Sequence, residues 1–368
     1  MKTKAHKKAP KELTYAEAGV DRTLRAESKR ALTILSQTYR FSRHGSIIRL
    51  PYGNIFPISG GLYLDLAIEG VGTKVLIAQL ADKYDTIGID GIGLAVNDVI
   101  RSGAKPLALA DNIHTHVSDP VLVKEWMKGI VRGASEAQCL VPSGEIGDVP
   151  EVIKGVVEGK GFDMVFASVG EMRQEDIIYG SNLKPGDVVI GLRSSGIHSN
   201  GVSLAREVLF KQWGGKYEPF DVPNGLDREL VYEVLEPMKI YVKPVMRLVS
   251  NHLIKAAIHI TGDAYLKFDR LMHLNKGVGF EFDNFRPQFI FDLIREVSMQ
   301  HRIPITNEEM FKTFNMGWGF AVVVDNALKE EAIGSLEKSG VETGEIGRVT
   351  GSERIVVRYH GKKILLLK

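Results

Sequence analysis

The fold is decided by the stretch Leu62-Tyr63-Leu64-Asp65-Leu66-Ala67-Ile68-Glu69-Gly70-Val71-Gly72-Thr73-Lys74. Its alternating apolar residues predict a strand that ends near Glu69, and Gly70 and Gly72 allow a tight turn after it. A carboxylate at a strand end can hold Mg²⁺, while backbone N–H groups and Lys74 can face phosphate oxygens. The spacing of a Walker A loop is absent, and such a turn is by itself more often structural than phosphate-binding. The rest of the chain must decide between these interpretations.

The composition is typical of a soluble globular protein. A chain of 368 residues, with 44% hydrophobic and 25% charged residues, is long enough for two domains. The formal net charge of +2 gives no reason to expect a nucleic acid as partner. Cys139 is the only cysteine, which excludes an intrachain disulfide and a zinc cluster of thiolates and favours a reducing compartment.

The beginning of the chain carries no targeting pattern. Residues 1–12 contain five lysines without an apolar core, so we expect a flexible basic tail and not a signal peptide. No apolar stretch in the sequence is long enough to span a bilayer. These features predict a cytoplasmic protein with neither a nucleic acid nor a membrane as partner.

Acidic residues follow three apolar stretches in a similar way. Glu69 ends the first stretch, Asp111 follows a predicted strand over Leu107–Ala110, and Glu145 follows the apolar run Cys139–Val141. If these strands are neighbours, their carboxylates converge, and converging carboxylates bind cations or share protons. Each acid alone is more often an exposed loop residue. The repeated pattern favours a metal site made of Glu69, Asp111 and Glu145.

Two further stretches place polar groups in apolar surroundings. Asn97 and Asp98 interrupt a predicted buried helix, so they need a site, a cap or a metal as partner. A buried strand over Val188–Leu192 leads toward a helix expected from about Val202, whose first turn offers free N–H groups to an anion. His198 lies just before that helix and could act as an acid, a base or a phosphate ligand.

Several of these stretches together resemble a known family. They are Leu13–Asp21, Gly70–Lys74, Asp85–Asp90 with Asn97-Asp98, Ser194–Gly201, Lys239–Pro244, His259–Gly262 and Glu309–Gly319. The sequence is similar to the phosphoribosylformylglycinamidine cyclo-ligases, also called aminoimidazole ribonucleotide synthetases. The patterns Ser-Ser-Gly-x-His-Ser-Asn-Gly and Thr-Phe-Asn-Met-Gly-x-Gly are specific to that family, and all the stretches keep its order between residues 13 and 347.

The resemblance implies a two-domain α/β (α+β) protein with a PurM-like fold. Residues 13–172 would form an ATP-binding and dimerisation domain, whose strands contribute to a barrel shared across a homodimer. Residues 173–368 would form a C-terminal α+β domain. The implied reaction uses ATP and Mg²⁺ to phosphorylate the amide oxygen of formylglycinamidine ribonucleotide, and ring closure then expels phosphate.

The resemblance also implies roles for individual residues. His198 and Asn200 would be catalytic and contact the reacting end of the substrate. The metal ligands would be Glu69, Asp111 and Glu145. The nucleotide and its phosphates would be bound by Gly70, Gly72, Thr73, Lys74, Asn97, Asp98, Ser195, Thr261 and Gly262.

The sequence departs from the family at residues that matter for binding. The family has an aspartate at the position of Glu69, and few glycines remain over residues 41–53, where the family has a glycine-rich loop. The family's Thr-Gly-Gly-Gly is Thr261-Gly262-Asp263-Ala264 here, so a carboxylate stands at a predicted phosphate-binding turn. Asp263 either opposes the phosphate, turns toward Lys267 or Arg270, or caps a helix that begins near Ala264.

Two alternatives to a cyclo-ligase stay open. The protein could be another ATP-using enzyme of the superfamily, such as a small-molecule kinase, or a non-catalytic paralogue that has lost its phosphate-binding glycines. Selenide dikinases and the dehydratases of hydrogenase maturation are disfavoured, because each uses a reactive cysteine or selenocysteine near a terminus. This chain has only Cys139.

Overall fold

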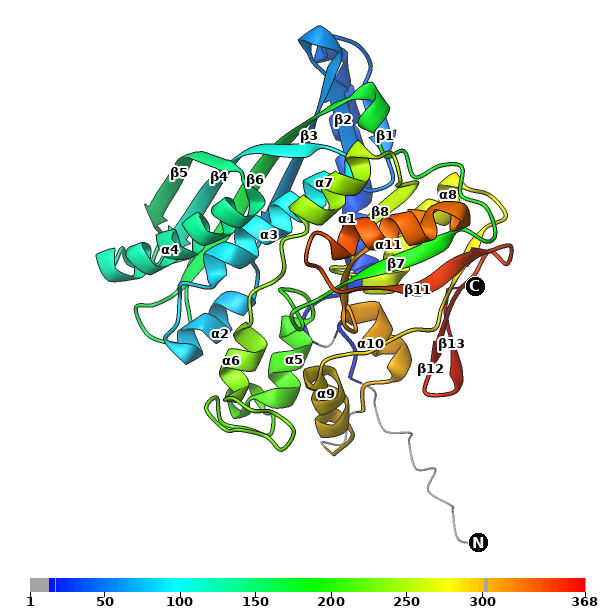
Figure 1. Cartoon of the computed structure of the whole chain (residues 1–368). Helices are drawn as coiled ribbons and strands as arrows, with labels where there is room; N and C mark the ends of the chain where they lie inside the picture. The colour runs from blue at the N-terminus through cyan, green and yellow to red at the C-terminus, as the bar shows by residue number, and fades with distance from the viewer. Residues whose placement is uncertain (1–12, 17, 301–303, 368) are drawn as a thin grey trace, which may run out of the picture.

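The computed structural model describes residues 13–16, 18–300 and 304–367 and contains two β-sheets (Figure 1). The basic tail predicted over residues 1–12 lies outside the described residues. The first sheet has the strand order β1-β2-β3-β6-β4-β5, in which only β4 and β5 are parallel neighbours. Its strands are β1 (Ile48–Leu50), β2 (Gly53–Pro57), β3 (Leu62–Gly70), β4 (Lys105–Thr115), β5 (Leu140–Asp148) and β6 (Phe162–Arg173).

The second sheet follows in the sequence and has the strand order β13-β12-β9-β11-β7-β10-β8. Its neighbours are antiparallel except β9 and β12. Both β7 and β10 lie in its interior, and every residue of β10 is buried. Its strands are β7 (Val188–Arg193), β8 (Ala256–His259), β9 (Gly279–Phe282), β10 (Trp318–Val324), β11 (Thr343–Thr350), β12 (Ile355–Tyr359) and β13 (Lys362–Leu367).

Helices are interspersed with the strands along the whole chain (Figure 1). Two short 3-10 helices contribute to the site, η3 (Ile100–Ser102) and η6 (Ala264–Phe268), and a longer one, η1 (Leu32–Phe41), follows α1. The α-helices are α1 (Arg22–Ala31), α2 (Lys74–Ala81), α3 (Ile87–Val99), α4 (Pro120–Ala137), α5 (Val202–Leu209), α6 (Leu230–Leu235), α7 (Val242–Ser250), α8 (Asp269–Leu274), α9 (Phe289–Gln300), α10 (Asn307–Thr313) and α11 (Lys329–Glu337).

Helix α3 is the central element of the first half. It is packed between the first sheet and α4, and all of its residues are buried. Such a position requires a helix that is apolar on most sides, and its few polar side chains, Asp90, Asn97 and Asp98, all have polar partners. Gly91 allows the close approach to the sheet, because a Cβ atom there would lie 1.9 Å from the ring of Phe166 on β6. The helix therefore brings Asp98, near its C-terminal end, to the junction of the two sheets.

The predicted α/β (α+β) fold class is confirmed, and two strands are longer than predicted. The chain passes from the first sheet to the second between Arg173 and Val188, close to the predicted boundary at residues 172/173. Strand β4 continues to Thr115, so Asp111 lies within it and not at its end. Glu145 likewise lies within β5. In both strands the backbone pairing with neighbours overrides the polar residues that suggested an end.

Apolar side chains from both halves form one large core cluster, to which α3 and the strands of the second sheet contribute. Among the residues that the structure describes, no helix combines the length and the apolar character needed to cross a membrane.

Candidate active site

A cleft lies where the first sheet meets the second half of the chain. Strand β2 pairs with β3 only as far as Asp65, so the edge of β3 beyond that residue is free and forms one wall. The turn Thr261–Asp263, directly after β8, and residues of α1 form a second wall. The cleft measures about 350 Å³, a usual size for a small-molecule site.

The cleft is unusually rich in charged side chains. Acidic and basic groups from β3, α3, η3, α1 and the segment after β8 face it together. These charged lining residues are Arg25, Lys29, Asp65, Glu69, Asp98, Arg101, Asp263, Lys267 and Arg270.

Asp98 is the centre of this charge network. Its Oδ2 is 2.7 Å from Nη2 of Arg101, and its Oδ1 is 2.7 Å from Nδ1 of His259 on β8. Burial raises the pKa of Asp98, but Arg101 and His259 outweigh that effect and hold it below its usual value. Burial lowers the pKa of His259 to about 4, so its ring is neutral near pH 7. Asp98 therefore stays ionised and ties the first half to the second sheet.

Glu69 lies close enough to Asp98 for the two carboxyl groups to influence each other's protonation. Burial, followed by the Asp98 charge, raises the pKa of Glu69 to about 8. Two carboxyl groups this close either share a proton or bind a cation together. The prediction that β3 presents Glu69 at its end is confirmed by the strand bounds Leu62–Gly70.

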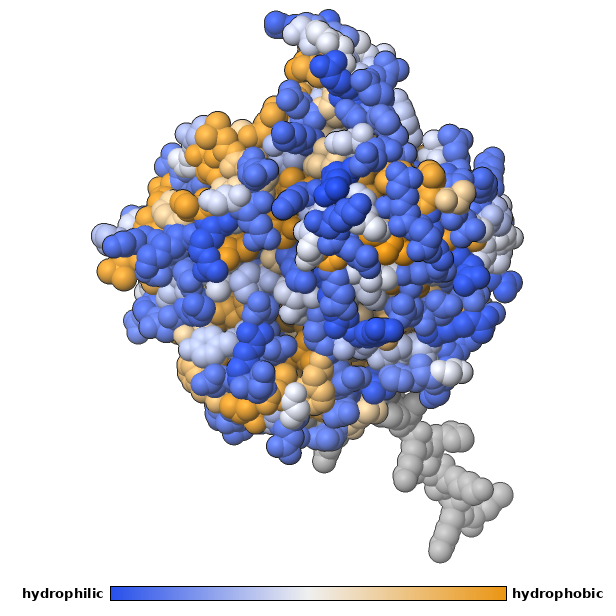
Figure 2. All heavy atoms as spheres, in the orientation of Figure 1, coloured by the Kyte–Doolittle hydropathy of each residue, from blue (hydrophilic) through white to orange (hydrophobic). Residues whose placement is uncertain are grey.

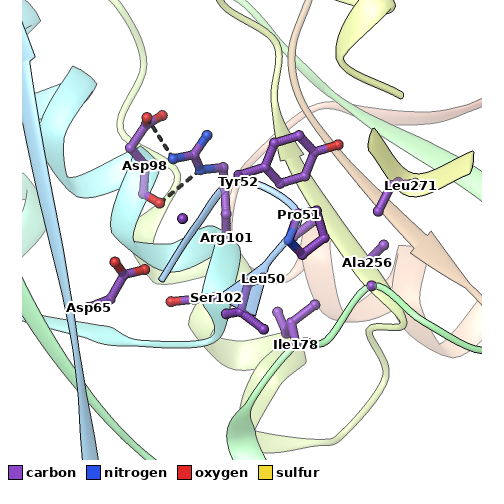
Figure 3. A pocket seen from close by; sticks show the side chains of 13 residues that line it. Leu50, Pro51, Tyr52, Asp65, Asp98, Arg101, Ser102, Ile178, Ala256 and Leu271 are labelled. Carbon is purple, nitrogen blue, oxygen red and sulfur yellow. Dashed lines mark hydrogen bonds and ion pairs between the residues drawn. The ribbon is translucent and has the colours of Figure 1, made fainter. Parts of the chain in front are cut away.

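A small side pocket opens next to Asp98, as Figure 3 shows. The Arg101 guanidinium extends from Asp98 toward the ring of Tyr52, whose centroid lies 5.3 Å from its central carbon (Figure 3). Arg270 lies 5.6 Å from the same ring, and the Tyr52 hydroxyl donates to the carbonyl of Lys267 at 3.0 Å. Tyr52 is thus held between two cations and fixes the floor of the cleft.

Lys267 reaches the cleft from η6 and adds a basic group to it. The sequence suggested Lys267 only as a partner for Asp263. Its Nζ donates to the carbonyl of His259 and to Oγ1 of Thr261. Burial lowers the pKa of Lys267 to about 8, although Asp98 opposes the shift. Lys267 therefore holds the Thr261 turn and adds positive charge beside Asp98.

The partners of Asp263 differ from those predicted. Its Oδ2 pairs with Nη2 of Arg25 at 2.6 Å and its Oδ1 lies 3.5 Å from Nε of Arg22, so it turns toward α1 and not toward Lys267 or Arg270. The side chain makes no capping hydrogen bond to η6. Its carboxylate charge is thus offset by two arginines, because α1 packs against this turn.

The predicted convergence of three carboxylates is wrong. Glu69 pairs with Phe166, and Phe166 pairs with Asp111, which puts Glu69 and Asp111 two strand spacings or about 10 Å apart. Glu145 is opposite Asn112, so its side chain points to the other face of the sheet from Asp111. The actual neighbour of Glu69 is Asp98, which comes from a helix and not from a strand.

The predicted phosphate contact of Lys74 is also wrong. The Lys74 side chain is fully buried, and its Nζ donates to Oδ1 of Asp90 at 2.8 Å and to the carbonyl of Glu236 at 2.6 Å. Ser199 and the N–H of Met238 donate to the same Asp90 oxygen. Helix α2 begins at Lys74, and this first residue points into the protein, where it links the two halves of the chain.

The rest of the glycine turn has a structural role. Gly72 has a φ of 69°, a conformation that favours glycine. Thr73 Oγ1 lies 3.0 Å from Oγ of Ser203 on α5. Gly70, Gly72 and Thr73 are not among the residues that line the cleft. Their predicted binding to the nucleotide therefore has no support from their positions.

Asn97 and Ser195, also predicted to bind the nucleotide, join backbone segments. The Asn97 side chain donates to the carbonyl of Lys239 at 2.9 Å and accepts from the N–H of Tyr241 at 2.8 Å. Ser195 Oγ donates to the carbonyl of Pro237 at 2.5 Å. Both residues hold the segment before α7, whereas Thr261 and Gly262 do line the cleft.

The two predicted catalytic residues lie in different surroundings. His198 is 1% exposed, and its Nε2 accepts a hydrogen bond from the Ser195 N–H at 3.2 Å. Burial lowers the pKa of His198, and the ring does not line the cleft, so a contact with substrate is not supported. Asn200 does line the cleft, and its buried Nδ2 has no hydrogen-bond partner among the described residues. An unsatisfied donor of this kind fits a ligand oxygen.

The donor set of the cleft fits Mg²⁺ bound together with a phosphate. Glu69 and Asp98 supply two adjacent carboxyl groups, and a cation would take the place of their shared proton. Within residues 13–16, 18–300 and 304–367, no group of three or more His, Cys, Asp or Glu side chains could hold a metal ion. Mg²⁺ commonly takes one or two carboxylates and completes its shell with phosphate and water oxygens.

Sequence family models match both halves of the chain. The N-terminal domain of AIR synthase related proteins matches residues 53–171, and the C-terminal domain matches residues 184–360. Solved structures share the fold at low identity. HypE, a hydrogenase maturation protein, has a TM-score of 0.57 at 14% identity and covers 84% of this chain and 89% of its own. PurL of T. maritima, solved with ATP, has a TM-score of 0.55 at 12% identity, over 84% of this chain and 44% of its own.

The fold and the charged cleft define an α/β protein of the PurM-like class. Proteins of similar sequence narrow this class to one family. The phosphoribosylformylglycinamidine cyclo-ligase of Pyrococcus horikoshii is 36% identical over 353 residues, which cover 95% of this chain and 99% of the relative. That of Methanocaldococcus jannaschii is 36% identical over 96% of this chain and 99% of the relative. The chain belongs to the phosphoribosylformylglycinamidine cyclo-ligase family.

The burial of Lys74 gives a stability prediction. Replacing Lys74 by Met leaves the Asp90 carboxylate buried without its cation, which should cost about 3–5 kcal/mol of the free energy of unfolding. The double variant Lys74→Met with Asp90→Leu removes both charges and should recover most of that loss. Urea denaturation followed by circular dichroism measures both. A double variant no more stable than Lys74→Met would contradict the pairing.

Proposed function

We propose that this protein is an ATP-dependent phosphoribosylformylglycinamidine cyclo-ligase that converts formylglycinamidine ribonucleotide to aminoimidazole ribonucleotide in purine biosynthesis. The observation that carries the proposal is the match of cyclo-ligases to almost the whole chain, which includes both walls of the cleft. The paired carboxyl groups of Glu69 and Asp98 support the use of ATP with Mg²⁺. The single cysteine supports the cytoplasm as the compartment.

The proposed reaction requires that the amide oxygen of the substrate is activated by phosphorylation. ATP, when bound with Mg²⁺, supplies the phosphoryl group that turns a poor amide leaving group into phosphate. Glu69 and Asp98 hold the cation, and His259 orients Asp98 through the 2.7 Å contact of its Nδ1. Asn200 offers its amide N–H groups to a substrate oxygen, and Lys267 offsets negative charge next to Asp98.

The proposed activity is tested by ADP release with and without formylglycinamidine ribonucleotide. We expect release that depends on the ribonucleotide. Glu69→Gln keeps the size of the side chain but replaces a carboxylate by a neutral amide, which binds a cation much more weakly, so turnover should fall by roughly 100-fold. Asp111→Asn is the matched control on the same sheet face and should change turnover by less than about 2-fold.

Other outcomes of the ADP-release assay would favour the two alternatives to a cyclo-ligase. ADP release that does not need the ribonucleotide would favour a kinase of a different substrate. A complete lack of ADP release would favour a non-catalytic paralogue. An equal loss in Glu69→Gln and Asp111→Asn would restore the originally predicted metal site.

We also propose that the protein is a homodimer formed through the first sheet. The face of this sheet away from α3 and α4 carries exposed apolar side chains, among them Leu66 and Ile68 of β3, which are 55% and 63% exposed. Figure 2 shows apolar surface at the upper left, where Figure 1 places β4, β5 and β6. Contiguous apolar surface of this kind is typical of an interface, and it agrees with the shared barrel that the family resemblance implies.

Light scattering tests the dimer. The wild type should give twice the chain mass of 40.7 kDa. Ile68→Asp places a charge in the proposed interface and should give the monomer mass. Val131→Asp, at a position 63% exposed on α4 and so on the covered side, is the matched control and should stay dimeric. A wild type that is monomeric at assay concentrations would contradict the proposal.

A further inference from the structure

Helix α1 contributes two basic side chains to the cleft. Arg25 and Lys29 are four residues apart, which puts them on one face of the helix, and both line the cleft. Arg30 is on the same helix but does not line it. Arg25 stands at the wall formed by the Thr261–Asp263 turn, where it pairs with Asp263, whereas Glu69 is carried by β3.

The Arg25 guanidinium uses only some of its hydrogen-bond donors within the described part of the protein. Its Nη2 donates to Oδ2 of Asp263 at 2.6 Å, and its other nitrogens make no hydrogen bond with the described residues. The side chain is 37% exposed. Both terminal nitrogens lie 3.8 Å from the place that a Cβ atom on Gly262 would occupy, so the guanidinium extends over bare backbone. A planar group with several remaining donors suits the oxygens of a phosphate.

The charges around Arg25 leave this wall positive. Arg22 is fixed by Oε1 of Glu309 at 2.9 Å and by Oγ1 of Thr313 at 2.7 Å, and it also lies near Asp263. The carboxylates of Asp263 and Glu309 are thus offset by Arg22 and Arg25. Lys29 has no ion-pair partner in the described part of the chain, so its ammonium group is surplus positive charge beside the cleft.

We propose that Arg25 and Lys29 bind the phosphomonoester of the sugar-phosphate substrate at this wall. The assignment rests on the proposed function, because it gives the phosphomonoester of the substrate and the metal-bound triphosphate different binding residues in one cleft. The carboxyl pair of Glu69 and Asp98 suits a triphosphate that brings a metal ion. Arg25, with a neighbouring lysine and the unsatisfied Asn200 amide, suits a phosphate without one. Asp263 does not prevent this binding, because its charge is already paired.

Calorimetry with ribose 5-phosphate as the probe tests the proposal. Arg25→Ala should raise the Kd by about 10- to 100-fold, the usual loss for a charged hydrogen bond to a phosphate. Lys29→Ala should raise it by about 3- to 10-fold, because a flexible exposed lysine contributes less. Arg30→Ala removes the same charge from the same helix outside the cleft and should change the Kd by less than about 2-fold.

A second series with a non-hydrolysable ATP analogue and Mg²⁺ separates the two phosphate sources. The same variants should leave the Kd of the analogue within about 2-fold of the wild type. The proposal is overturned if Arg25→Ala binds ribose 5-phosphate as well as Arg30→Ala does. It is also overturned if the loss appears only with the ATP analogue. The melting temperatures of the variants, and the charge-conserving Arg25→Lys, exclude a folding defect as the cause.

The proposed cyclo-ligase activity and the proposed phosphate site at Arg25 can be refuted independently of each other. A wild type that binds ribose 5-phosphate through Arg25 but shows no ADP release with formylglycinamidine ribonucleotide would contradict the cyclo-ligase activity and support this binding site. A wild type that has the cyclo-ligase activity, but whose Arg25→Ala and Lys29→Ala variants bind ribose 5-phosphate unchanged, would support the activity and contradict the binding site.

Discussion

The ionised Asp98 at the junction of the two halves is the interaction on which the site depends. It lies near the end of the fully buried helix α3 and is bound by Arg101 from its own side and by His259 from the second sheet. A buried charge is tolerated only when it is paired and hydrogen-bonded, so this geometry fixes how the halves meet. The same constraint keeps Glu69 protonated near neutral pH, with a pKa of about 8, until a cation can replace that proton.

The turn after β8 combines left-handed backbone with a carboxylate that is paired to helix α1. Asp263 and Ala264 have φ angles of 68° and 37°, a region in which glycine is favoured. The family resemblance implies glycines at these positions, and the backbone here follows the left-handed course that glycine favours. Arg22 and Arg25 of α1 pair with the Asp263 carboxylate and offset its charge. The wall of the cleft at this turn is consequently basic.

Local patterns in the sequence predicted the strand that ends at Glu69, the buried helix with Asp98 and the helix that begins at Val202, because periodicity and turn residues determine such elements. They did not predict which side chains meet. Glu145 faces away because register across the sheet decides the side, and no local signal carries register. Arg25 meets Asp263 across 238 residues of sequence, so only the folded chain reveals that pair.

The central claim is that Glu69 and Asp98, and not Glu69, Asp111 and Glu145, form the cation site. Anomalous X-ray diffraction from crystals grown with Mn²⁺ and a non-hydrolysable ATP analogue tests it most directly. The account predicts a Mn²⁺ peak within roughly 2.0–2.3 Å of carboxylate oxygens of both Glu69 and Asp98. A peak at Asp111 or Glu145, with none between Glu69 and Asp98, would contradict it.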